Sequence, residues 1–162
     1  MAEILILGLG NPLFRDDGIG VRAIDILERH FSSVADLESS AEHGMALMDH
    51  FIGYRYAILI DAIQTGQHPP GTVRELDPSR LGRVLSPSPH YAGLPEMIEA
   101  ARQLDVSFPD SFVIISVEVE DMATMIEGLT PDVEAALPRI VDIVDEKVRN
   151  WLHNSDGQPS RA

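Results

Sequence analysis

Three side chains of this sequence could face one cation. Asp17 follows an apolar run at 4–7 and a glycine turn, Asp61 ends the apolar run at 56–60, and His90 lies in a proline-rich loop before a helical pattern. Two carboxylates at one crevice repel each other, so at least one is protonated or both hold a cation. Two oxygens and an imidazole suit a borderline divalent metal and leave positions for a substrate group. The spacing therefore predicts an open three-ligand site.

Each acid also has a purely structural interpretation. Asp17 and its neighbour Asp16 begin a helical pattern, where carboxylates suit the helix dipole, and Asp61 could cap a turn. A sheet with its first three strands in the order 2-1-3 favours the site interpretation. That order places the ends of the first and third strands side by side, at the switch point where open α/β sheets bind ligands.

The remaining histidines are expected at the surface or the edge of the core, with His68 a weak candidate ligand in a proline-rich loop. They are His30, His43, His50, His68 and His153.

The residues or motifs of several other kinds of catalytic or binding site are missing from this sequence. The chain has no cysteine, which excludes disulfides, thiolate zinc sites and a cysteine nucleophile. It has no GxSxG elbow and no HExxH helix. Ser86 and Ser88 lie near His90 in the sequence, but a serine two residues from a histidine is common, so a catalytic serine triad is disfavoured. The turn GLGNPL starts like a dinucleotide fingerprint, but its third glycine is replaced by Leu13, so nucleotide binding is disfavoured.

The overall composition argues against some classes of binding partner. Twelve basic and 26 acidic residues give a net charge of −14, which argues against binding a phosphate backbone. The simplest interpretation of this acidity is solubility, with a basic protein partner or a cation site as the alternative, and the charge alone does not decide between them. The apolar runs are far shorter than the roughly 20 residues of a membrane helix, and no targeting segment begins the chain. A soluble, cytoplasmic protein is expected.

Strand and helix patterns alternate along the chain. Strands are expected at 4–7, 56–60, 112–117 and, more weakly, near 34–40. The connection 62–71 is too short and too rich in Gly and Pro for a crossover helix. The polar segment 72–76 is therefore expected to run antiparallel to 56–60, at a sheet edge.

Helical stripes complete the pattern. Helices are expected at 18–31, briefly after Gly44, at 94–104 and at 130–152. The third should bury Leu94, Met97, Ile98, Ala101 and Leu104. Thr130 and Pro131 should begin the last helix, and Pro138 should bend or interrupt it. The alternation predicts a three-layer α/β fold, with one domain at 1–154 and a polar, disordered tail at 155–162.

Four segments, in order and spacing, resemble the nickel–iron hydrogenase maturation endopeptidases. They are GLGNPLFRDDGIGV at 8–21, the strand ending in Asp61 and Ala62 with Gly66 following, PHYAGLP at 89–95 and GLTPDVEAALP at 128–138. The resemblance implies a mixed, mostly parallel five-stranded sheet in the order 2-1-3-5-4 with one antiparallel strand, of the phosphorylase/hydrolase-like type. It also implies an endopeptidase that removes a C-terminal extension from a nickel-loaded hydrogenase large-subunit precursor.

The resemblance also assigns roles to the three candidate ligands. It implies that Asp17, Asp61 and His90 form the catalytic site and meet nickel, which the precursor supplies. The first position is often Glu in this family, so Asp17 is a shorter version that should hold the metal closer to the backbone. Asp16 is its neighbour, and the sequence leaves open which of the two is the first ligand.

Two other functions share parts of this pattern. GLGNP also resembles the opening of peptidyl-tRNA hydrolases, but Asp16, Asp17 and Gly18 replace their Arg-His-Asn segment, and the acidic charge disfavours a tRNA. A metal-reading chaperone or binding module that does not cut would have nearly the same sequence. The loop 77–93 is a candidate docking surface, with Leu81, Val84, Leu85 and Tyr91 as its apolar residues.

Overall fold

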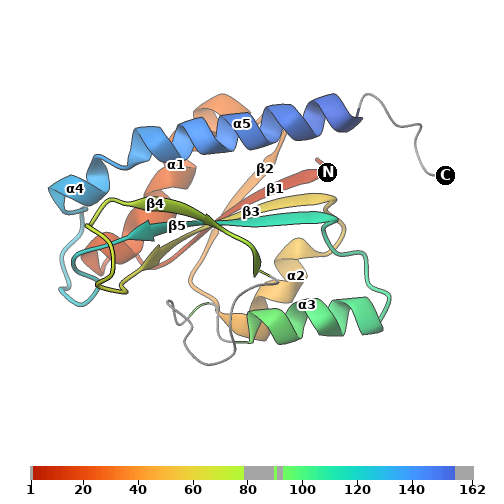
Figure 1. Cartoon of the computed structure of the whole chain (residues 1–162), viewed down its shortest axis with the longest axis horizontal. Helices are drawn as coiled ribbons and strands as arrows, with labels where there is room; N and C mark the ends of the chain where they lie inside the picture. The colour runs from red at the N-terminus through yellow and green to blue at the C-terminus, as the bar shows by residue number, and fades with distance from the viewer. Residues whose placement is uncertain (1, 79–89, 91–92, 156–162) are drawn as a thin grey trace.

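Five strands form one sheet in the order β2-β1-β3-β5-β4 (Figure 1). The structure is a computed structural model that describes residues 2–78, 90 and 93–155. The strands are β1 (Ile4–Leu9), β2 (Asp36–Ser40), β3 (Tyr56–Ile63), β4 (Val73–Leu76) and β5 (Ser111–Glu118). All neighbours pair in parallel except β4, which is antiparallel to β5. The expected order and the single antiparallel edge strand are confirmed.

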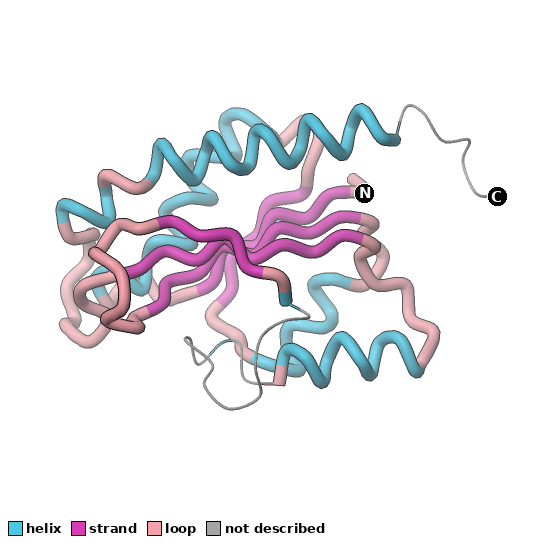
Figure 2. The backbone as a smooth tube through the Cα atoms, in the orientation of Figure 1, coloured by secondary structure: helices cyan, strands magenta, loops and turns pink. Residues whose placement is uncertain are grey.

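Helices cover both faces of this sheet (Figure 2). They are the short 3-10 helices η1 (Arg15–Gly18) and η2 (Gly44–Leu47), and the α-helices α1 (Ile19–Phe31), α2 (Met48–Phe51), α3 (Leu94–Gln103), α4 (Pro131–Glu134) and α5 (Leu137–Ser155). Among the described segments, no helix combines the length and the apolar character needed to span a bilayer.

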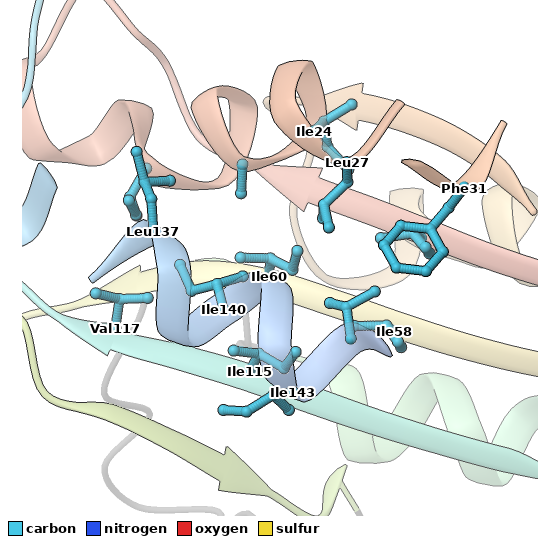
Figure 3. Close-up of a cluster of buried hydrophobic side chains, with 14 of the residues drawn as sticks. Ile24, Leu27, Phe31, Ile58, Ile60, Ile115, Val117, Leu137, Ile140 and Ile143 are labelled. Carbon is cyan, nitrogen blue, oxygen red and sulfur yellow. The ribbon is translucent and has the colours of Figure 1, made fainter. Parts of the chain in front are cut away.

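The helices α1 and α5 pack on one face of the sheet. Their buried side chains recur at helical spacing and meet isoleucines and valines of β3 and β5 (Figure 3). Gly20, in the first turn of α1, lies directly on the strands: a Cβ there would be 2.4 Å from the Leu9 carbonyl oxygen and 2.7 Å from that of Ile60. Only glycine allows this approach, which fixes the start of α1 against the carboxyl ends of β1 and β3.

The helices α2 and α3 pack on the opposite face. Successive strand residues point to opposite faces, so Leu5 and Leu7 of β1 and Leu59 of β3 form this second core with Phe51 and Leu94. Asp61, two residues after Leu59 on β3, shares this face. The alternation of the strand therefore directs the Asp61 carboxylate toward the side where α3 begins.

The structure corrects two expectations about the strands and helices. First, β3 does not end at Asp61 but continues to Ile63, because the ladder with β5 continues through Asp61–Ser116 to Ile63–Glu118. Second, Leu104 is 69% exposed, because α3 ends at Gln103.

The expected last helix consists of two helices. Thr130 and Pro131 begin α4 as expected, but α4 ends at Glu134 and α5 starts at Leu137, with Pro138 in its first turn. Proline is tolerated in a first turn, where its missing N–H has no intrahelical partner. The predicted interruption is confirmed. Of the predicted tail, 156–162 lies outside the described residues.

Candidate metal centre

The three candidate ligands come together at the carboxyl edge of the sheet. One ligand atom from each of Asp17, Asp61 and His90 lies within 4.8 Å of one from each of the other two. Asp17 follows β1 on η1, Asp61 lies near the end of β3, and His90 precedes α3. Asp61 is fully buried and His90 is 7% exposed, while Asp17 is half-buried. Of the three side chains, Asp17 is therefore the most accessible to solvent.

The glycine turn after β1 determines where Asp17 lies. Gly10 has a φ of +131°, and a Cβ there would stand 1.9 Å from the Asp17 carbonyl oxygen, so no other residue fits. Because the backbone at Gly10 lies so close to Asp17, the Asn11 backbone N–H can donate to Asp17 Oδ2 at 2.9 Å. Arg15 has a φ of +44°, an uncommon conformation for a residue with a side chain. Its N–H donates to the Ile126 carbonyl at 2.9 Å, which ties the turn to the loop after β5.

Asp61 and His90 form a buried pair. His90 Nδ1 lies 3.0 and 3.1 Å from the two carboxylate oxygens of Asp61. Burial lowers the pKa of His90, but the hydrogen bond to Asp61 and the charges of Asp61 and Asp17 outweigh it, so this pKa is raised above its usual value. Asp61 thus orients the imidazole, and the negative charge of both carboxylates favours a positive group at this edge of the sheet.

Asp16 has a different environment from Asp17. It is fully buried, and its carboxylate accepts hydrogen bonds from the backbone N–H groups of Glu120, Asp121 and Thr130, at 2.7 to 3.1 Å, and from the Thr130 hydroxyl. Asp16 therefore holds the 120–130 loop and the start of α4 against η1, and only Asp17 belongs to the group with Asp61 and His90.

One residue near the group was missed by the sequence reasoning. His43, expected at the surface, is exposed, but its ring centroid lies 5.4 Å from that of His90. The available signal was its position just after β2, because the carboxyl ends of parallel strands share one edge. Of the other sequence candidates, Ser86, Ser88, Leu81, Val84, Leu85 and Tyr91 lie outside the described residues.

The chemistry of the group fits a divalent ion such as nickel. Carboxylate oxygens and an imidazole are both ligands for first-row divalent metals, and three protein ligands leave positions for donors from a second molecule. Their ligand atoms lie within 4.8 Å of one another, so the three side chains could hold one ion.

Comparison with known proteins identifies the scaffold that carries this group. The family model described as hydrogenase maturation protease matches residues 23–147. The chain belongs to the hydrogenase maturation protease family. A relative is the hydrogenase 2 maturation protease of Escherichia coli, 32% identical over 83% of this chain and 84% of that protein. The hydrogenase expression/formation protein HupD of Thiocapsa roseopersicina is 33% identical over 83% of this chain, and 66% of its own length is covered.

The fold agrees with this membership. The solved structure of the hydrogenase maturating endopeptidase HybD from E. coli superposes with a TM-score of 0.78 at 30% identity, over 93% of this chain and 94% of that one. The mixed five-stranded sheet with one antiparallel pair is shared with hydrogenase maturation protease structures. As a hydrogenase maturation protease, the chain is a hydrolase of peptide bonds.

Proposed function

We propose that this hydrogenase maturation protease removes a C-terminal extension from the precursor of a nickel–iron hydrogenase large subunit, and that Asp17, Asp61 and His90 meet the nickel which the precursor carries. The observation that carries the proposal is the convergence of these three side chains, within 4.8 Å, on a scaffold of this family. The nickel belongs to the substrate, so the ion itself marks a precursor that is ready for cleavage.

Each residue has a distinct task in this proposal. The half-buried Asp17 stands at the open side and is the first carboxylate that an incoming ion meets. The buried pair of Asp61 and His90 lies behind it, with the imidazole oriented by the 3.0 Å contact to Asp61. Once the ion is held, the precursor has a fixed position in the crevice, and fixing two reactants relative to each other supplies much of a catalytic rate. The carboxylates can also accept the proton of an attacking water.

Processing of purified, nickel-loaded precursor tests this proposal, with the mass of the large subunit as the readout. Asp61→Asn and Asp17→Asn keep the shape of the side chain but remove its charge, and His90→Ala removes the imidazole. We expect each to slow processing by at least about 100-fold, because metal sites lose about 10–100-fold even when only a supporting residue changes. Near-ultraviolet circular dichroism should show that the variants remain folded.

The matched control is Asp142→Asn, which removes the same charge from an exposed position on α5. It should process the precursor at the unaltered rate. Full activity of the Asp17 and Asp61 variants would contradict the proposal and leave these acids with structural roles only. A chain that binds the loaded precursor but never shortens it would instead be a metal-reading binding module.

A further inference from the structure

His43 lies beside the metal-facing group without an evident structural role. Its ring is tilted by 52° to that of His90, with the two centroids 5.4 Å apart. The side chain is exposed, and it makes no capping hydrogen bond at the start of η2, although it occupies the N-cap position. Within the described part of the chain, no hydrogen bond or ion pair involves His43. Neither burial nor capping explains an imidazole at this place.

The backbone around His43 is held against the segment that carries His90. A Cβ on Gly93, three residues after His90, would contact the Cα of Gly44 at 3.8 Å, so the two segments touch. Gly44 itself is buried and has a φ of +57°. The placement of His43 next to His90 is therefore built into the backbone, while the exposed side chain can still change rotamer.

A hydrogen-bonded clamp holds the same segment from the other side. The His50 ring lies between two glutamates, with Nδ1 2.8 Å from Glu38 and Nε2 2.7 Å from Glu42. The Glu42 backbone N–H also donates to the Ser40 hydroxyl at 3.1 Å. Glu42 directly precedes His43, so these bonds tie its position to the end of β2 and to α2.

We propose that His43 is a further metal-facing residue, whose imidazole gives a nitrogen donor to the nickel of the precursor beside His90. This inference rests on the proposed function, because it concerns the same nickel. Two ligands of one ion, each about 2.0–2.2 Å from it, lie about 3–4 Å apart, and the facing edges of the two rings are closer than their centroids. A rotation of the exposed His43 side chain brings its ring to that position.

The second imidazole would also set metal preference. Two carboxylates and one imidazole are an oxygen-rich ligand set. Mg²⁺ is bound almost wholly by oxygen, whereas nickel accepts imidazole readily. A nitrogen from His43 therefore favours Ni²⁺ over Mg²⁺ at this edge of the sheet. A precursor that carries the wrong ion would then be held less well than one that carries nickel.

Calorimetric titration of the precursor-free chain with NiCl2 and with MgCl2 tests the assignment. His43→Ala removes the ring, and His43→Phe keeps a ring against His90 but has no nitrogen. We expect both to bind Ni²⁺ at least about tenfold more weakly, with Mg²⁺ binding unchanged. His153→Ala, at an exposed position on α5, is the matched control and should bind as the unaltered chain does.

The two variants separate a ligand from a packing role. Nickel affinity retained by His43→Phe, alone or together with His43→Ala, would overturn the proposal. Processing of nickel-loaded precursor by His43→Phe at the unaltered rate would also overturn it, while leaving the proposed function intact. If the unaltered chain fails to process the precursor, the proposed function fails, and the nickel titration still decides whether His43 is a donor.

Discussion

Asp16 and Asp17 are adjacent residues of one type with different surroundings. Consecutive side chains of a 3-10 turn point about 120° apart, so the two carboxylates of η1 face different parts of the molecule. Asp16 points inward to the N–H groups of the 120–130 loop, whereas Asp17 points to Asp61 and His90. One acid therefore fixes a loop beside the site, and the other faces the site.

This difference predicts that the same substitution will destabilise the chain far more at Asp16 than at Asp17. Asp16→Asn removes a buried charge that accepts several hydrogen bonds and turns an amide toward N–H donors. We expect it to lower the free energy of unfolding by about 3 kcal/mol, since a hydrogen bond to a charged group contributes about 1.5–3 kcal/mol. Asp17→Asn should change it by less than about 1 kcal/mol. Urea unfolding of both variants measures the contrast, and a larger loss for Asp17→Asn would show that the roles are reversed.

The sequence could indicate the candidate site residues but could not decide which of two adjacent acids faces the site. The positions of Asp17 and Asp61 follow from strand ends, which the apolar runs reveal. The choice between Asp16 and Asp17 depends on a φ of +44° at Arg15 and on contacts to residues more than 100 positions away, and neither is visible in local spacing. The surface position of His43 was expected, but its contact with the His90 ring was not, because a lone exposed histidine carries no periodic signal.

At the scale of elements, the segment between β2 and α2 is held in place by the His50 ring, which is hydrogen-bonded to Glu38 and Glu42. Burial lowers the pKa of His50, but its hydrogen bonds and charge interactions with Glu38 and Glu42 outweigh this, so the pKa is raised. Donation from both ring nitrogens requires the protonated imidazole. The contribution of the clamp to stability is therefore fully present below the unfolded-state pKa of about 6.5 and is lost as the pH rises through the higher folded-state pKa.

The clamp predicts a pH-dependent difference between the unaltered chain and His50→Gln. The unaltered chain should be the more stable below about pH 6.5, and the difference should shrink as the pH rises above that value. Its size should be at most about 1 kcal/mol, because both glutamates are partly exposed and solvent screens such pairs. Urea unfolding across this pH range measures it. His30→Gln, on the exposed face of α1, is the control, and a pH-independent difference for His50→Gln would refute the clamp.

Element boundaries were predictable where periodicity or proline marks them. The stripe of α1 and the start of α4 at Thr130 and Pro131 were expected and are observed. The length of β3 was underestimated, because its last residues are held as a strand by β5 and their own sequence gives no such signal. Only the pairing partner determines that boundary.

At the scale of the whole molecule, the alternation of apolar runs and helical stripes was enough to predict the layers. Polar character placed 72–76 at an edge, and β4 (Val73–Leu76) is the antiparallel edge strand. The net charge of −14 did not distinguish a cation site from simple solubility. The proposal of a cation site therefore rests on the geometry, because only the folded chain brings ligand atoms of Asp17 and Asp61 within 4.8 Å of each other.

Two forms of one precursor provide the most direct test of the central claim, that this site recognises nickel carried by the precursor. Purified large-subunit precursor would be prepared with and without nickel and incubated with the unaltered chain, and the mass of the large subunit would be followed over time. The account predicts loss of the C-terminal extension from the nickel-loaded form only, with no shortening when Asp61→Asn replaces the unaltered chain. Equal cleavage of the nickel-free precursor would contradict it.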